Sequence, residues 1–135
     1  MSLFQVFDVS ASAISAQSQR LNVVASNLAN AESVAGPDGK PYKARQVVFQ
    51  AQMSGNDPAS AGVAVSQVVE DNTEGRKVHD PQNPAADSDG YITMPNVNPI
   101  EEMVNMISAS RGYQTNVDVM NTAKGLLQKV LQLGS

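Results

Sequence analysis

The sequence has no cysteine, no tryptophan and a single histidine, and it is poor in aromatic and charged residues. The absence of cysteine excludes a disulfide framework, a thiolate zinc site, an iron–sulfur cluster and thiol catalysis. One histidine, His79, excludes a metal site built from several imidazoles. Charged residues make up only 16% of the 135 residues, against roughly 25% in an average soluble chain. The formal net charge of −4 argues against nucleic acid as a partner, because binding to it depends on neutralising phosphates with lysine and arginine.

Long apolar runs are also missing. No uninterrupted apolar stretch is longer than three residues, whereas a membrane-spanning helix needs about 20. The first twenty residues contain Asp8 and Arg20 but no apolar run of signal-peptide length. We therefore expect no membrane insertion and no cleaved signal. Export by a route that reads no cleaved signal stays compatible with this pattern.

Charge and turn-forming residues are concentrated in the middle of the chain. Residues 32–98 hold nine acids, five bases and six of the seven prolines, whereas the two flanking segments are each neutral overall. This pattern predicts a mostly α fold with a small β insert. We expect segments 1–33 and 98–135 to be long helices that pair as a coiled coil and form one helical domain, with a β- and loop-rich insert over 34–97.

The N-terminal segment has a heptad-like period. Its apolar and small positions step alternately by three and four residues along Phe4, Phe7, Ala11, Ile14, Ser18, Leu21, Ala25 and Leu28. That spacing predicts a helix over residues 2–31. We expect it to end before Gly36 and Pro37, because proline cannot continue a helix.

The C-terminal segment begins with helix-start signals. Asn98 suits the N-cap, Pro99 suits the first helical position, and Glu101 and Glu102 favour the positive end of the helix dipole. The same alternating steps then run along Met103, Met106, Ser110, Tyr113, Val117, Met120, Lys124, Leu127 and Leu131. We expect a helix of 30 or more residues that stops near Gly134.

The middle segment changes to a period of two. Valine-rich stretches at 45–50 and 62–71 predict strands, and 76–79 and 91–94 are shorter candidates. Residues 80–90 have the proline and glycine content of a loop.

Two arrangements in the insert could suggest chemistry, and both are weak. His79 and Asp80 are neighbours, but adjacent residues of an extended segment point to opposite sides, and no serine nucleophile is marked by a glycine-rich elbow. Asp87, Asp89 and Gly90 resemble part of a calcium loop. With Gly90 at the sixth position, however, Ala85 and Asn96 take the first and twelfth positions, where calcium loops need acids. We expect no catalytic residue, no metal site and no cofactor.

The two helical ends are poorly suited to standing alone. Alanine and serine weaken the N-terminal stripe, serine also interrupts the C-terminal one, and many flanking positions carry amides and hydroxyls. Below roughly 70–80 residues, a single core rarely supplies more than about 3–5 kcal/mol. We expect the helices to be buried by neighbouring copies in an assembly, and their ends to be loose in the free monomer.

Several runs resemble the flagellar axial proteins, the family of rod, hook and related subunits. The N-terminal run Leu21–Ala31 is similar to the family's signature, and Arg111–Gln114 with Asn116–Met120 is similar to its C-terminal partner. The resemblance extends over nearly the whole chain and is closest to a proximal rod subunit, on the runs Pro41–Lys43, Asp80–Pro81, Gly90–Ile92, Pro95–Asn98 and Glu101–Met103.

The resemblance implies a structural subunit without catalysis, exported by the flagellar type III apparatus without a cleaved signal. The implied partners are copies of the chain, the rod proteins FlgB, FlgF and FlgG, the rod–ring junction protein FliE and the export apparatus. The implied location is the periplasmic rod of the basal body, a hollow shaft that transmits torque. We expect an assembly interface made by Phe7, Ile14, Leu21, Asn27, Leu28, Asn30, Met103, Tyr113, Asn116, Val117, Met120, Leu127 and Leu131. The three asparagines either bond between subunits or only terminate local helical turns.

Other readings stay open on the sequence alone. A sister rod protein of similar size differs from this reading only in the middle segment and the start of the C-terminal helix. A coiled-coil adaptor would instead bind a partner helix in a groove, and a small hydrolase would use His79 and Asp80.

Overall fold

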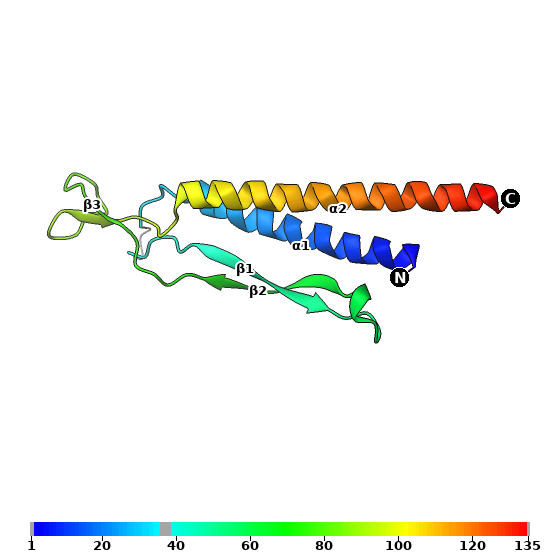
Figure 1. Cartoon of the computed structure of the whole chain (residues 1–135). Coiled ribbons are helices and arrows are strands. Elements are labelled where there is room, and N and C mark those ends of the chain that lie inside the picture. Colours follow the sequence, from blue (N-terminus) through cyan, green and yellow to red (C-terminus); the bar gives the residue numbers. More distant parts are fainter. Residues whose placement is uncertain (1, 36–38, 135) are drawn as a thin grey trace.

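The protein consists of two long antiparallel helices with a β hairpin beside them, as seen in a computed structural model that describes residues 2–35 and 39–134 (Figure 1). Helix α1 spans Leu3–Ala29 and helix α2 spans Pro99–Leu133. This arrangement confirms the predicted mostly α fold with a small β insert. At about 1.5 Å per residue, α2 is the longer helix, and its C-terminal turns project past the start of α1 (Figure 1). Neither helix, over the residues that the structure describes, is long and apolar enough to cross a membrane.

Side-chain caps define where the helices begin. Ser2 and Gln5 form a capping box at α1: the Gln5 amide donates to Ser2 Oγ (3.2 Å) and the Ser2 amide donates to Gln5 Oε1 (2.8 Å). At α2, Asn98 Oδ1 accepts from the Ile100 amide (3.1 Å), as the sequence predicts. Helix α1 ends at Ala29, within two residues of its predicted end. Gly36 and Pro37, expected to follow it, lie outside the described residues.

The insert forms two small antiparallel sheets. Strand β1 (Arg45–Gln52) pairs with β2 (Gly62–Glu70), and a short 3₁₀ turn, η1 (Pro58–Ser60), lies in their connection. Strand β3 (Lys77–His79) pairs with β4 (Tyr91–Thr93). All four predicted strands and the loop over 80–90 are therefore confirmed, with ends that differ by one or two residues.

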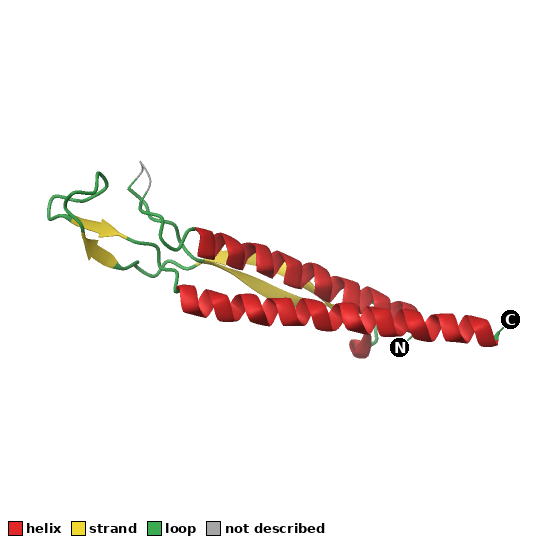
Figure 2. Cartoon of the chain, turned by 90° about the horizontal axis from the view of Figure 1, so that it is seen from above, coloured by secondary structure: helices red, strands yellow, loops and turns green. Residues whose placement is uncertain are grey.

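The β1–β2 hairpin packs along α1. The β3–β4 hairpin lies beyond the helix pair, at the end where α1 finishes and α2 begins (Figures 1 and 2). Ser12 holds β2 against the helix, because its hydroxyl accepts from the Val63 amide (3.1 Å). Gly62 permits this approach, since a Cβ there would lie 2.8 Å from Ser12 Oγ. The core is thin: its buried apolar residues are Ala16, Val24, Ala31, Ala44, Ile92, Met94, Ala109 and Ala123. The largest side chains that are completely enclosed belong to Asn27 and Ser60.

Candidate functional site: the helix pair and its faces

The seam between α1 and α2 is made by small residues. Ala16 on α1 and Ala109 and Ala123 on α2 are buried. Gly112 lies against the side chain of Gln17, and a methyl group added at this glycine would lie 3.0 Å from Gln17 Nε2. Small side chains let two helix backbones approach closely, so the seam is narrow and leaves most large apolar side chains outside it.

The apolar residues predicted for the assembly interface fall into two groups. The following are half-buried within the chain: Phe7, Ile14, Leu21, Leu28, Val117, Met120 and Leu127. Three others are exposed, namely Met103, Tyr113 and Leu131. The predicted stripe on α2 therefore lies beside the line that meets α1. The difference arises because the stripe was built on large side chains, whereas the contact within the chain follows alanine and glycine.

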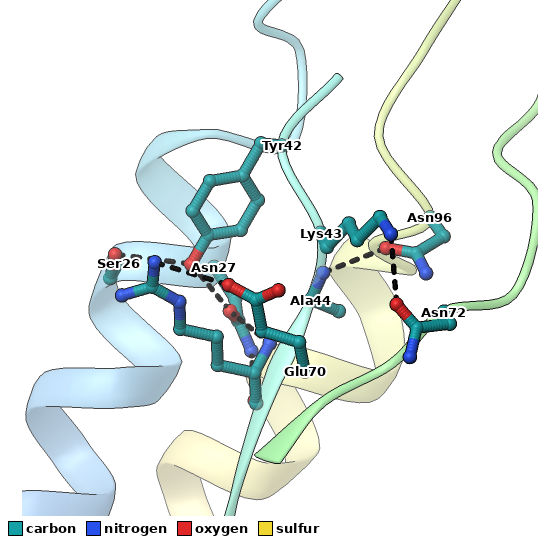
Figure 3. A network of polar contacts seen from close by, with 9 residues as sticks. Ser26, Asn27, Tyr42, Lys43, Ala44, Glu70, Asn72 and Asn96 are labelled. Atoms are coloured by element: carbon teal, nitrogen blue, oxygen red, sulfur yellow. Dashed lines mark hydrogen bonds and ion pairs between the residues drawn. The ribbon is translucent and has the colours of Figure 1, made fainter. Parts of the chain in front are cut away.

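Asn27 connects three separate parts of the chain, and Figure 3 shows it beside Tyr42. Its Nδ2 donates to the Arg45 carbonyl (2.8 Å) and to Glu102 Oε2 (3.1 Å). Its Oδ1 accepts from the Arg45 amide (3.0 Å) and from the Tyr42 hydroxyl (2.8 Å). The side chain is fully buried, with 0% exposure, so it fixes α1, the start of β1 and α2 to one another within a single chain.

Asn96 performs a similar task at the other side of the same region (Figure 3). Its Oδ1 accepts from the Ala44 amide (2.7 Å), and its Nδ2 donates to the carbonyls of Asp71 (2.8 Å) and Thr73 (2.9 Å). The segments before β1, after β2 and before α2 thus meet at this amide.

The other two predicted asparagines bond locally. Asn30 caps the end of α1, and its Nδ2 donates to the Ser26 carbonyl (2.9 Å). Asn116 Nδ2 donates to the Gly112 carbonyl one turn earlier in α2 (2.7 Å). Within the single chain, both side chains therefore bond to the carbonyl of the preceding turn.

The outward faces of the two helices differ in character. The exposed positions of α1 are mostly small or polar and follow the line Phe4, Asp8, Ala11, Ser15, Gln19, Asn22, Ala25 and Ala29. The first two turns of α2 instead expose large apolar side chains: Ile100 (74% exposed), Met103 (54%), Val104 (60%) and Ile107 (58%). Contiguous exposed apolar side chains of this kind mark interaction surfaces in soluble proteins.

A second apolar area lies where α1 begins. A groove of about 380 Å³ runs between the helices there and is lined in part by Leu3, Val6, Val119 and Leu126. Beyond it, α2 continues as an overhang without a helix beside it, and Leu133 is 88% exposed. The helix pair therefore leaves apolar surface uncovered at both of its ends.

The arrangements that could suggest chemistry have structural roles. The His79 ring packs edge-on against the Tyr91 ring, with centroids 4.9 Å apart. Asp87 Oδ1 accepts from the amides of Asp89 (3.0 Å) and Tyr91 (2.9 Å), so this carboxylate closes its own turn. Among the residues that the structure describes, no three histidine or acidic side chains come together as a group that could hold a metal ion.

The turn after β2 lowers the pKa of Asp71 from its ordinary value. The side-chain hydroxyl of Thr73, and then its backbone amide, donate to the carboxylate of Asp71 and lower the pKa of that group below 3.8. Asp71 is half-buried and lies in the turn after β2, so hydrogen bonds within a local turn account for this shift.

Sequence reasoning missed Tyr42, Asn96 and Ser12 as functional positions. Tyr42 and Asn96 both lie in runs that carry the family resemblance, Pro41–Lys43 and Pro95–Asn98. The sequence therefore marked these two positions as part of a family motif, but it did not show which contacts their side chains make. Ser12 lies in a helix among other small residues and has no sequence signal that separates it from them.

Comparison with known proteins matches both ends of the chain to flagellar families. Residues 7–37 match the family model described as flagella basal body rod protein. Residues 88–133 match the model described as flagellar basal body rod FlgEFG protein C-terminal. These two segments contain most of α1 and all of α2, so the matches fall on the helix pair.

Full-length relatives narrow the family. The chain is 58% identical to the flagellar basal-body rod protein FlgC of Yersinia enterocolitica over 135 residues, which cover 99% of both chains. It is 53% identical to FlgC of Salmonella typhimurium over 134 residues and 41% identical to FlgC of Bacillus subtilis over 150 aligned positions, again with 99% of both chains covered. Because these matches extend from end to end and include the insert, the chain belongs to the FlgC family of flagellar basal-body rod proteins and is a structural subunit of the flagellar rod.

Proposed function

We propose that the protein polymerises helically in the proximal part of the rod, as part of a hollow shaft that transmits motor torque across the periplasm. Its role is structural and involves no catalysis. The observation that carries this proposal is the combination of a full-length match to rod proteins with large apolar side chains left exposed along α2. Such side chains are stabilised when neighbouring subunits remove them from water.

The assembly interface consists of the two helices, and the insert over 34–97 faces outward from the tube. The residues proposed to contact neighbours are Phe7, Ile14, Leu21, Leu28, Met103, Tyr113, Val117, Met120, Leu127 and Leu131. Asn27, Asn30 and Asn116 support this interface from within the chain, since their amides bond to the same chain. In this proposal, segments 1–33 and 98–135 act as one helical domain.

The partners that fit these surfaces are proteins with similar helices. We assign to them copies of this chain, the rod proteins FlgB, FlgF and FlgG, and the rod–ring junction protein FliE. The chain reaches the periplasm through the flagellar export apparatus without a cleaved signal. The thin core supports this route, because a chain that buries few apolar side chains needs little free energy to unfold before passage.

The test is electron microscopy of basal bodies from cells that lack this gene, together with a swimming assay. We expect membrane rings from which neither rod nor hook grows, and restoration of both by the wild-type gene. Complete basal bodies and swimming cells in the absence of the gene would refute the proposed role.

A further inference from the structure

The first turns of α2 present an apolar patch with a single charge at its end. Ile100, Met103, Val104 and Ile107 follow the spacing i, i+3, i+4, i+7 on the side of α2 that faces away from α1, and Arg111 continues the same line one turn later. All five side chains are exposed. We call these five residues the α2 patch.

The outward face of α1 has complementary properties. Ala11, Ser15 and Gln19 are exposed and lie on one line with Asp8, which is the one acidic residue of this helix. Short side chains along a helix leave a shallow channel into which longer apolar side chains fit. The charge on this face is opposite in sign to that of Arg111.

We propose that the α2 patch of one copy packs against the outward face of α1 of a second copy, with Arg111 facing Asp8. This contact rests on the proposed function and specifies which surfaces of the rod subunit meet. The contact places the apolar side chains of the α2 patch on the short side chains of α1, and it pairs Arg111 at the edge of the patch with Asp8 at the edge of the α1 face.

The charge pair also fixes the register. In antiparallel helices, a step back along α2 from Arg111 corresponds to an equal step forward along α1 from Asp8. Val104 therefore faces Ser15, and Ile100 faces Gln19. Within one chain, by contrast, Asn27 bonds to Glu102 and Gln17 lies against Gly112. The contact between copies is therefore displaced from the contact within a copy by ten residues, or about 15 Å along the helix axis.

Another outward cation on α2 does not fit. If Lys129 were paired with Asp8, Val104 would lie opposite Ser33, beyond the end of α1 at Ala29. The apolar patch would then have no helix beneath it. Arg111 is the base that brings Asp8 and the patch onto the same contact.

Such a contact does not close on itself. The α2 patch of a copy differs from the α1 face to which it binds, so the two end copies of any stack together leave one free α2 patch and one free α1 face. A head-to-tail contact with an axial displacement generates an open helical stack and not a closed dimer.

Disulfide cross-linking tests this contact without background, because the chain has no cysteine. The variant carries Val104→Cys and Ser15→Cys in one chain and replaces the native copy in cells, from which basal bodies are isolated and oxidised. The proposed contact places these two positions of neighbouring copies opposite each other, and a disulfide needs Cα atoms within about 7 Å. We therefore expect a ladder of dimers, trimers and higher multimers. The matched control carries Val104→Cys and Ala25→Cys, the position opposite Val104 in the undisplaced register, and should give no ladder.

Each other outcome counts against the contact. A ladder from the control variant alone overturns the displaced register. Dimers without larger species overturn the open stack, and bands that contain a different protein overturn the choice of a second copy. If the double-cysteine cells swim but give no ladder, the contact is wrong while the rod function stands. Swimming cells that lack the gene altogether would instead overturn the proposed function.

Charge reversal provides an independent test in the same cells. We expect Asp8→Arg and Arg111→Asp each to cause a loss of swimming and of rods, and the double reversal to restore both. Asp118→Arg, which reverses an exposed charge of α2 outside the patch, is the matched control and should swim normally. Failure of the double reversal to restore rods, with all variants expressed and exported, would overturn the pairing.

Discussion

Replacing Asn27 with alanine should loosen the junction between the helices and the hairpin more than any other single amide removal on α1. The substitution removes four hydrogen bonds, two to the backbone of Arg45, one to Tyr42 and one to the carboxylate of Glu102. A neutral hydrogen bond contributes about 1 kcal/mol net and a bond to a charged group about 1.5–3 kcal/mol. Because Arg45 and Tyr42 are partly reached by water, we expect a loss of about 3 kcal/mol in the free energy of unfolding.

The assay is urea unfolding of the purified chain at fixed concentration, followed by the circular dichroism of the helices. Asn30→Ala is the matched control, because it removes one side-chain bond to Ser26 in a half-buried position and should cost no more than about 1 kcal/mol. Asn27→Asp should be worse than Asn27→Ala, since it places a second carboxylate beside buried Glu102. Equal effects of the alanine substitutions at 27 and 30 would refute the central role of this amide.

Three further predictions concern packing, titration and assembly. Gly112→Leu should lower the unfolding midpoint in urea because a side chain there meets α1 at contact distance, whereas Gly125→Ala, with open space around it, should raise stability by up to about 1 kcal/mol. Thr73→Ala should raise the pKa of Asp71 towards 3.8 in a carbon-detected NMR titration. The stabilisation from this turn is present above pH 3.8 and is lost as the pH falls through the lowered folded-state pKa, so an unchanged pKa would contradict the assigned cause. Leu28→Asp should leave expression intact but block rod assembly by placing an unpaired charge in the helix contact, and normal rods in that mutant would contradict the interface.

The helices and strands were predictable because their signals are local. The asparagine and proline at the start of α2 lie next to the turn that they stabilise, and the valine-rich strands are bounded by glycine and proline. Each of these features acts over a few consecutive residues, so it can be recognised in the sequence. The capping box at Ser2 and Gln5 is equally local, and a search for cap pairs would have found it.

The line along which the helices meet was not predictable from apolar spacing alone. Large side chains mark where a helix is apolar, but Ala109, Gly112 and Ala123 mark where another helix can come close. On α2 these two lines run side by side. Three of the large side chains, Met103, Tyr113 and Leu131, then remain exposed on the single chain, which suits a subunit that is completed by its neighbours.

The Asn27 junction was inaccessible for a different reason. Its partners Tyr42, Arg45 and Glu102 lie 15, 18 and 75 residues away in the sequence, and the chain folds back twice to bring them together. The resemblance to axial proteins drew attention to the run that contains this asparagine. Only the fold shows that its amide is used within one chain.

Hydrogen exchange measured on the free chain at low concentration and on isolated rods tests the central claim most directly. The claim is that the helices are completed by neighbouring subunits. In the free chain we expect slow exchange near Asn27 and fast exchange towards Leu3 and Leu133, where the helix pair leaves apolar surface uncovered. In rods, both helices should be protected along their whole length. Full protection of residues 2–30 in the free chain, unchanged by assembly, would contradict the account.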